Sequence, residues 1–406
     1  MPNDPAALVE RLECSRPDRR RDAEAVYDLT ARAFPYQGYW NWLEYCRTRY
    51  FHRNTYDWSA STVGRLDGTI VTHWGIWGYT MRIGRAKVRL AGVGAVATDD
   101  TLTKRGLMTR TGHLALQACK DAGYDVSILF GRENFYELFG FVPAWPGLGY
   151  TMAASRLPTD PPAARVRRFR STRPDLADAY NRHNASRTGT AVRPTTTAPW
   201  PAGRVGLLWA DGRGAAEGYV VFEGGGESIT VADFAGQAEQ VLRVVARHAR
   251  AVGAKEVHFP ELHAADPLAA SLRRLYARET FTWSRSGGAM ARCLNLLSTL
   301  TKMAGELSHR LRGSNLAGWR GQLLIADPRE QVALRLGDAK VSVHPAVGPA
   351  PHAIRGGDEI VQLLLGVADP DEILSASNIR LSGQAHRLLK ALFPNQHCRL
   401  SPWDRF

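Results

Sequence analysis

Cysteine is scarce in this chain. Only five occur in 406 residues, at positions 14, 46, 119, 293 and 398. Their number is odd and no two have the spacing of a zinc site or a redox motif, which argues against a disulfide-stapled secreted scaffold. We therefore expect no metal site and a reducing, cytoplasmic location.

Long apolar runs and targeting signals are also missing. No apolar stretch approaches the roughly 18 residues that a membrane span needs, and the start Met1-Pro-Asn-Asp lacks a basic-then-apolar signal pattern. We expect no membrane span. With 44% hydrophobic residues, the chain can still bury a core in each of two or three domains.

Acidic residues are outnumbered. There are 39 of them against 52 Lys and Arg, which gives a net charge of +13. The basic residues are dispersed, and the densest cluster, Arg165-Val-Arg-Arg-Phe-Arg170, indicates a solvated linker face. Neither a recognised nucleic-acid-binding module nor a basic stripe interleaved with aromatics is present, so we expect no nucleic-acid partner.

The stretch from residue 92 to residue 141 carries the most information. An apolar strand pattern, Gly92-Val-Gly-Ala-Val-Ala-Thr98, leads into the basic loop Thr103-Lys-Arg-Gly-Leu-Met108. Apolar residues at i, i+3 and i+4 then predict a helix that ends at Gly123. A buried strand, Val126–Phe130, is followed by Phe135-Tyr-Glu-Leu-Phe-Gly-Phe141.

The basic loop is suited to a diphosphate. The first four N–H groups of a helix have no intrahelical partner, and the helix dipole adds partial positive charge there. Gly106 allows the backbone to approach an anion closely. Lys104 and Arg105 add charge and hydrogen-bond donors beside it.

These elements resemble the Gcn5-related N-acetyltransferase (GNAT) superfamily. Its strand, pyrophosphate loop (Arg/Gln-x-x-Gly-x-Gly/Ala), helix, strand and Tyr-x-x-x-Gly-Phe follow each other here in order, the last as Tyr136 to Phe141. Thr103 stands where the family has Arg or Gln, and Met108 where it has a small residue. The resemblance implies acetyl-CoA as cosubstrate, and the positive net charge would assist capture of this anion.

From about residue 20 onwards the chain resembles the enhanced-intracellular-survival (Eis-like) acetyltransferases. The strands Asp67–His73 and Val88–Thr98, the length, and the ending Leu392-Phe-Pro394 with Trp403-Asp-Arg-Phe406 carry this likeness. The resemblance implies that the last segment is a strand whose terminal carboxylate points into the active site. It also implies a trimer or hexamer.

The pattern of the first region predicts the following order. Residues 1–22 are expected to be a frayed tail, Ala23–Phe34 a helix, and Tyr36–Tyr45 an aromatic helix. Val63–Tyr79 and Met81–Thr98 are predicted strands with hairpin signals at Asp67-Gly68 and Ile83-Gly84.

The remaining chain divides into two more regions. The second predicts strands over 205–210, 218–223, 228–234 and 256–260 and a helix over 237–252, but its strand–helix junction, Phe234–Ala238, has no basic glycine-spaced loop. The third predicts a helix over 296–311 and strands over 322–326, 331–336 and 340–344. With these elements the resemblance implies an α+β protein: a catalytic GNAT domain (1–158), a degenerate GNAT-like domain (159–293) and a sterol-carrier-protein-like α/β domain (294–406).

The site residues follow from the motifs and the resemblance. Tyr136 would protonate the leaving thiolate, although aromatic packing is its structural alternative, and the resemblance makes the carboxylate of Phe406 the base. Exposed strand donors at Val96 and Thr98 would polarise the thioester carbonyl. The residues expected to bind the cosubstrate are Val96, Ala97, Thr98, Lys104, Arg105, Gly106, Leu107, Met108 and Thr109.

The acceptor is expected to be a small-molecule primary amine or a lysine side chain. Tyr36, Trp40 and Glu44 are the candidate contacts, with core packing as the alternative for the aromatic residues, which include Tyr39 and Trp42, and exposure as the alternative for Glu44. His73 and His113 are expected to be structural. A non-catalytic acyl-CoA- or lipid-binding protein of the same architecture remains the rival interpretation.

Overall fold

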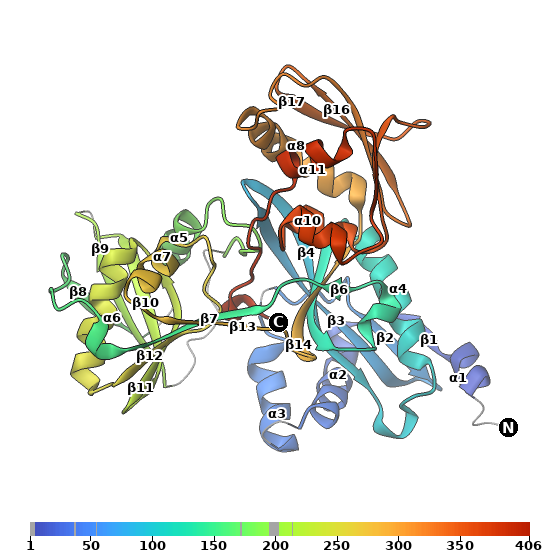
Figure 1. Ribbon diagram of the computed structural model, residues 1–406. Helices are drawn as coiled ribbons and strands as arrows, with labels where there is room; N and C mark the ends of the chain where they lie inside the picture. Colours follow the sequence, from blue (N-terminus) through green and yellow to red (C-terminus); the bar gives the residue numbers. More distant parts are fainter. Residues whose placement is uncertain (1–4, 36–37, 54, 171–172, 195–202, 213) are drawn as a thin grey trace.

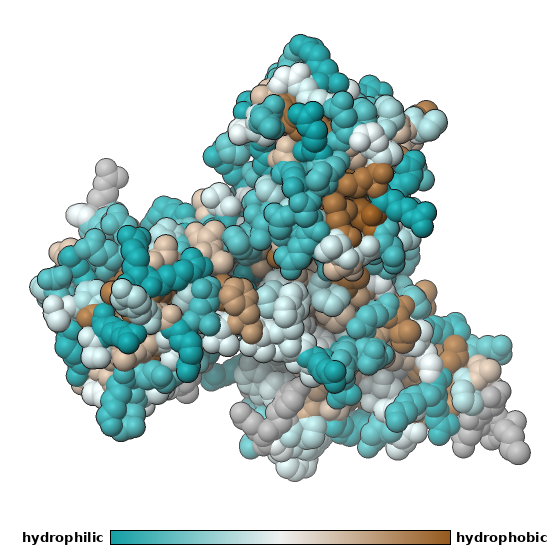
Figure 2. All heavy atoms as spheres, in the orientation of Figure 1, coloured by the Kyte–Doolittle hydropathy of each residue, from teal (hydrophilic) through white to brown (hydrophobic). Residues whose placement is uncertain are grey.

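A computed structural model describes residues 5–35, 38–53, 55–170, 173–194, 203–212 and 214–406. Within these residues the strands form two seven-stranded sheets and one five-stranded sheet. Figure 1 shows them as three lobes, with the C-terminus at the centre where the lobes meet. The surface in this orientation is mostly hydrophilic, with a compact apolar patch on the upper lobe (Figure 2).

The first sheet contains most of the N-terminal region. Its strands, in spatial order, are β1 (Glu13–Ser15), β2 (Thr62–Leu66), β3 (Thr69–Ile83), β4 (Ala86–Thr98), β5 (Val126–Arg132), β14 (Ser286–Cys293) and β6 (Val142–Pro143). Its helices are α1 (Pro5–Arg11), α2 (Arg19–Ala33), α3 (Tyr39–Tyr45) and α4 (Leu107–Asp121). The two predicted hairpins are confirmed, because β2, β3 and β4 pair antiparallel around Gly68 and Gly84, both at positive φ.

The expectation of a frayed tail over residues 1–22 is wrong for residues 5–22. Leu8 and Leu12 of this segment are buried in one cluster with Leu66 and Leu107. Strand β1 pairs with β2, and the carboxylate of Asp18 caps α2 by accepting hydrogen bonds from the next residues' backbone N–H groups. Apolar burial and a capped helix therefore hold the segment in place.

The second sheet has a similar order with a parallel pair at its centre. Its strands are β13 (Arg278–Thr282), β7 (Gly147–Ala153), β12 (Glu256–Phe259), β11 (Ser228–Ala235), β10 (Ala216–Gly225), β9 (Val205–Ala210) and β8 (Val166–Phe169). Its helices are α5 (Pro174–His183), α6 (Ala238–Val252) and α7 (Pro267–Arg274). The predicted strands and helix of this region are all found, within two residues at each end.

The first two lobes exchange strands. After β6 the chain enters the second sheet as β7, between β12 and β13, although residue 158 is the expected domain boundary. It returns from β13 through β14, which pairs with β5 and β6 of the first sheet. The two sheets are therefore connected at two crossings, and residues 147–153 lie with the second lobe.

The third lobe is a five-stranded sheet with helices against it. Its strands, in spatial order, are β17 (Lys340–Pro345), β16 (Gln331–Gly337), β15 (Gly321–Ala326), β18 (His352–Arg355) and β19 (Arg380–Ser382). Its helices are α8 (Leu296–Arg312), α9 (Ile360–Leu365), α10 (Pro370–Ser375) and α11 (Ala385–Leu392). Leu300 and Leu307 of α8 share one apolar core with Met81, Val88 and Ile128 of the first sheet.

The expected final strand is wrong. Residues 393–406, all of which are described, contain a single short 3-10 turn (Pro402–Asp404) and no strand. The segment runs from the third lobe between the other two as extended, irregular chain (Figure 1). It is held by side-chain contacts rather than by sheet pairing.

Mixed α/β architecture with several mixed sheets is thus confirmed. Among the described helices, none is long and apolar enough to cross a membrane.

Candidate functional site

A wedge between β4 and β5 defines the candidate site. The two strands run parallel and pair from Leu90 with Val126 to Val93 with Leu129. Beyond this register β4 continues to Thr98 and β5 to Arg132. Past Val93 and Leu129 the two strands no longer pair with each other, while β4 remains paired with β3 through Thr98. We call the space between these two unpaired ends the wedge.

A β-bulge at Ala95 changes the register of the end of β4 against β3. Ala95 has φ +47°, and the register with β3 shifts here. Ala95 and Ala97 are buried on one face of the sheet, whereas Val96 packs on the other face against the cluster that contains Trp74 and Tyr136. Val96 and Thr98, the predicted carbonyl-polarising donors, lie on the arm of β4 past the paired register.

His73 holds this bulge. The Nδ1 atom of His73 lies 2.8 Å from the carbonyl oxygen of Ala95. A carbonyl oxygen can only accept, so Nδ1 carries the proton and donates it. In the neutral ring Nε2 is then the acceptor, and it accepts from the hydroxyl of Tyr56 at 2.9 Å. Burial lowers the pKa of His73 to about 4, so the ring is neutral. This placement agrees with the structural role expected for His73. His113 lies exposed on α4 with its ring beside Phe139.

The basic loop enters α4 through left-handed backbone. Lys104 has φ +60° and Gly106 has φ +80°, and Gly106 is the N-cap residue of α4. The side chain of Lys104 is exposed, and the first turn of α4 contains no acidic residue. No acidic side chain of the first turn therefore competes with an anion for the positive end of the helix.

The predicted cosubstrate-binding residues differ in whether a side chain or only the backbone is accessible to a ligand. Leu107 and Met108 are 1% and 8% exposed, because their side chains pack into the core. Ala97 is also buried. These three residues can reach a ligand only through backbone groups, whereas Lys104 also offers its side chain.

Tyr136 lies on the α4 face of the sheet. It begins the 3-10 turn Tyr136–Phe139, and its ring lies directly over Gly131 of β5, where any Cβ would clash with it. Trp74, Phe135 and Phe141 contact the ring edge-to-face at centroid distances of 4.9 to 6.2 Å. Aromatic packing therefore fixes the ring beside the arm of β5 that borders the wedge.

Phe406 lies on the opposite face of the sheet. Its ring covers Gly92 of β4 and packs against Tyr79 and Phe130, each at 5.9 Å between centroids. Phe130 and Gly131 are consecutive in β5 and face opposite sides. The terminal residue and Tyr136 consequently flank the wedge from its two faces.

Sequence reasoning missed several residues around the terminus. Tyr50 and Trp77 lie beside Gly94, and Arg53 donates from Nη1 to the carbonyl oxygen of Arg405 at 2.7 Å. The guanidinium of Arg405 stacks over Phe130 at 4.2 Å. Paired glycines inside a strand, Gly92 and Gly94, were the available signal, because such glycines mark close approach of another group.

A cavity of ≈ 350 Å³ is lined by chain neighbours of both catalytic candidates, Glu137 and Arg405, but not by Tyr136 or Phe406. It is lined by Phe130 and Gly131 of β5, by Arg405, and by residues from the β13–β14 connection that include Trp283. Glu133 and Glu137 bring carboxylates to its wall. The volume is within the range of small-molecule sites.

The predicted acceptor contacts lie on or before α3. Tyr36 lies outside the described residues. Trp40 is 75% exposed and Glu44 is also exposed, as its structural alternative expects. The hydroxyl of Tyr39 donates to Asp28 at 2.5 Å. The Trp42 ring packs at a tilt against Tyr50, 5.7 Å between centroids, and so reaches the site only through that residue.

No metal-binding group is found in the part of the chain that the structure describes: three or more His, Cys, Asp or Glu side chains nowhere gather there.

The sequence matches a known domain family. Residues 15–144 match the family model described as an acetyltransferase (GNAT) domain. The match begins in β1 and ends just after β6, so it includes the whole wedge and both of its arms. No curated protein sequence matches the chain significantly.

Solved structures share the complete fold. A probable N-acyltransferase from Enterococcus faecalis V583 has a TM-score of 0.76 at 14% identity, covering 97% of this chain and 99% of its own. A GCN5-related N-acetyltransferase from Kribbella flavida has 0.72 at 16%, covering 97% and 100%. Eis1 from Mycobacterium abscessus has 0.68 at 16%, covering 94% and 97%. All three lobes therefore occur together in other proteins.

These findings establish the domain and the enzyme class. The chain contains a GNAT acetyltransferase domain and is an acyltransferase.

Proposed function

We propose that the protein transfers the acetyl group of acetyl-CoA to a primary amine, either of a small molecule or of a lysine side chain. The observation that carries this proposal is the position of Tyr136 and of the Phe406 carboxyl on the two faces of one wedge. Acyl transfer to an amine needs a base that can reach the attacking nitrogen and an acid that can reach the departing sulfur.

The wedge and the loop would supply the binding contacts for the cosubstrate. Backbone donors of Val96, Ala97 and Thr98 would hold the pantetheine arm. Lys104, Arg105 and the amides of Gly106, Leu107, Met108 and Thr109 would hold the diphosphate. When bound, the thioester supplies an acetyl group that an amine can attack. The N–H groups at Val96 and Thr98 would stabilise the negative charge that develops on its carbonyl oxygen.

Proton transfers fall to the two flanking residues. The carboxylate of Phe406 would accept a proton from the acceptor ammonium or from the attacking amine. Tyr136 would donate its phenolic proton to the departing thiolate, and a phenol of ordinary pKa near 10 is a suitable acid for that purpose.

The acceptor would occupy the ≈ 350 Å³ cavity beside Phe130 and Gly131. Of the three carboxylates in its lining, Glu133 pairs with Arg285 and Glu261 pairs with Arg405, so attraction of a cationic amine would fall mainly to Glu137. Trp283 would offer an aromatic surface. Trp40 and Glu44, which are exposed on α3, remain proposed acceptor contacts, and so does Tyr36, which lies outside the described residues.

The third lobe has no catalytic part in this proposal. We propose that the third lobe is sterol-carrier-protein-like, that it serves as scaffold for the C-terminal segment, and that the enzyme is a cytoplasmic homo-oligomer. The core that α8 shares with the first sheet supports the scaffold role.

Thiol release from acetyl-CoA in the presence of a panel of primary amines tests the function. We expect turnover by the unmodified chain and a loss of about 10²–10⁴ in kcat in Tyr136→Phe. One residue appended after Phe406 displaces the carboxylate and keeps the ring, so kcat should also fall.

Two results would contradict the proposal. Absence of thiol release with every amine, together with fatty-acid binding, would favour the non-catalytic alternative. Full activity in the extended chain would remove Phe406 as the base and leave Tyr136 to be judged separately.

A further inference from the structure

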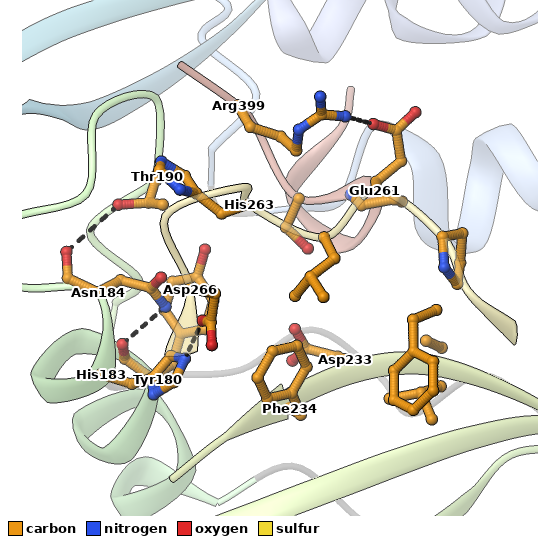
Figure 3. Close-up of a pocket in the computed structure, with 17 residues that line it drawn as sticks. Tyr180, His183, Asn184, Thr190, Asp233, Phe234, Glu261, His263, Asp266 and Arg399 are labelled. Atoms are coloured by element: carbon orange, nitrogen blue, oxygen red, sulfur yellow. Dashed lines mark hydrogen bonds and ion pairs between the residues drawn. The ribbon is translucent and has the colours of Figure 1, made fainter. Parts of the chain in front are cut away.

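The second sheet contains a wedge like that of the first. Strands β11 and β12 run parallel and pair from Ser228 with Glu256 to Thr230 with His258. Past this register the chain continues as Val231–Phe234 on one side and Phe259–His263 on the other, and both stretches line one cavity. Figure 3 shows Asp233 and Phe234 from the first arm facing Glu261 and His263 from the second.

This second wedge is occupied by the chain itself. Arg399, Ser401 and Pro402 line it together with the two arms. The space left is ≈ 60 Å³, well below the roughly 300 Å³ of a typical ligand pocket. The loop into α6 also lacks basic residues, and its N-cap, Gln237, makes no side-chain capping bond.

The segment that fills the wedge is deeply buried. Arg399 is 5% exposed, Leu400 is 0% exposed and Asp404 is 6% exposed. The backbone of Arg399 lies so close to Gly189, at φ +89°, that a Cβ on Gly189 would meet its carbonyl oxygen at 2.6 Å. The backbone N–H of Arg399 donates to Thr188 at 3.2 Å.

Asp404 is anchored by side chains of the second lobe. Its carboxylate accepts from Nε of Arg193 at 2.9 Å and from the hydroxyl of Tyr180 at 3.0 Å. Arg193 also pairs with Asp233 of β11 at 2.6 Å, and its guanidinium lies 3.4 Å from the centroid of the Tyr180 ring. Burial raises the pKa of Asp404, so loss of its partners would leave a costly buried carboxylate.

Glu261 links the second wedge to the residues just before Phe406 through two ion pairs. It lies at the end of the β12 arm and pairs with Arg399 on one side (Figure 3) and with Arg405 on the other, the latter at 2.8 Å. Arg405 stacks on Phe130, and Phe406 follows it onto Gly92. Two residues of chain span at most about 7 Å, so fixing Asp404 restricts where the terminal carboxylate lies.

We propose that the wedge of the second sheet binds the chain's own C-terminal segment in place of a coenzyme. We further propose that Asp404 and Arg193 are positioning residues that hold the Phe406 carboxylate in the first wedge. The catalytic part of this inference rests on the proposed function, in which that carboxylate is the base. The anchoring part is independent of it.

Asp404→Asn tests both parts, since it keeps the size of the side chain and removes its charge. We expect kcat for acetyl transfer to fall about 10- to 100-fold, with acetyl-CoA affinity by calorimetry unchanged. Carboxypeptidase A should release Phe406 at least tenfold faster, as measured by mass spectrometry. In the chain extended after Phe406, Asp404→Asn should cause no further loss of kcat, because the carboxylate is already displaced.

Two further variants separate positioning from general stability. Glu306→Gln alters another buried carboxylate, which pairs with Arg310 in α8 at 2.8 Å, and it should leave kcat and Phe406 release unchanged. Tyr180→Phe removes one hydrogen bond to Asp404 without stranding a charge. It should give a smaller effect in the same direction, and it replaces Asp404→Asn if that variant does not fold.

The outcomes distinguish this inference from the proposed function. Unchanged Phe406 release and unchanged kcat in a folded Asp404→Asn chain would overturn the inference. Faster release with unchanged kcat would overturn the positioning role and the base assignment, but acyl transfer would stand if Tyr136→Phe is inactive.

Discussion

The carboxyl carbon of Phe406 lies 3.2 Å from the position that a Cβ would occupy on Gly94. These residues are 312 positions apart in the sequence, and the approach is possible only because Gly94 has no side chain. The same Cβ position is 3.1 Å from the Tyr50 hydroxyl and 2.9 Å from the Trp77 ring. The terminus is therefore enclosed where β4 leaves its pairing with β5.

Gly94→Ala should displace the terminal carboxylate. The added methyl group meets the Phe406 carboxyl and two aromatic side chains, and Trp77 is fully buried and cannot yield easily. We expect kcat to fall about tenfold or more and folding stability to fall by about 1–3 kcal/mol, as for other overpacked sites. Gly225→Ala is the control, because this strand glycine has open space around it, and it should leave kcat unchanged.

Gly106→Ala should weaken cosubstrate binding. At φ +80° an alanine is strained by about 1 kcal/mol, and relief of that strain would turn the first amides of α4 away from the diphosphate. We expect KM for acetyl-CoA to rise several-fold, while kcat at saturation changes little. Gly253→Ala, at φ +73° with nothing within 4 Å, carries a similar strain at the end of α6 and should leave KM unaltered.

Lys104→Gln should make cosubstrate binding less dependent on salt. Lys104 is exposed at the start of α4, so its attraction to the anionic cosubstrate is screened within about 10 Å at 0.1 M ionic strength. We expect a higher KM for acetyl-CoA at low salt and a smaller difference from the unmodified chain at 0.5 M NaCl. Lys87→Gln, exposed at the far end of β4, should behave like the unmodified chain, and an equal change in both would contradict the role of Lys104.

Local patterns predicted the elements of the fold closely. Alternation and the Asp67-Gly68 and Gly84 turn signals located β2, β3 and β4, and periodicity with Gly123 located α4. The prediction for the N-terminal segment was wrong because its many arginines give it a polar composition, which outweighs Leu8 and Leu12. These two leucines are buried by Leu66 and Leu107, which lie far along the chain. The strand exchange through β7 and β14 could not be predicted, since pairing partners far apart in sequence leave no local signal.

In the candidate site, too, local motifs could be recognised in the sequence, whereas contacts between distant residues could not. Tyr136 and the basic loop could be proposed from the sequence because their chemistry is concentrated in short motifs. Tyr50, Arg53 and Glu261 were missed, because nothing within their own segments indicates that they lie near Phe406. The anchoring of Asp404 by Arg193 joins residues 211 positions apart, and it follows only from the tertiary structure.

Acid should destabilise the first lobe through His73. The pKa of this buried histidine is lowered to about 4, whereas in the unfolded chain it is near 6.5. Between these values the unfolded state binds the proton and the folded state does not, so the free energy of unfolding falls as pH drops from 6.5 towards 4. The slope from this residue is at most about 1.4 kcal/mol per pH unit.

Urea unfolding followed by tryptophan fluorescence at pH 5 to 7 measures this slope. His73→Gln should be less stable at pH 7, because the bond to Ala95 is altered, but should show a shallower decline towards pH 5. The buried His263, whose pKa is lowered to about 3 mainly by burial, contributes a similar decline that remains in this variant. His113→Gln, altered on the exposed face of α4, should keep the full slope, and an undiminished slope in His73→Gln would show that this histidine is not the neutral, buried group that holds the bulge.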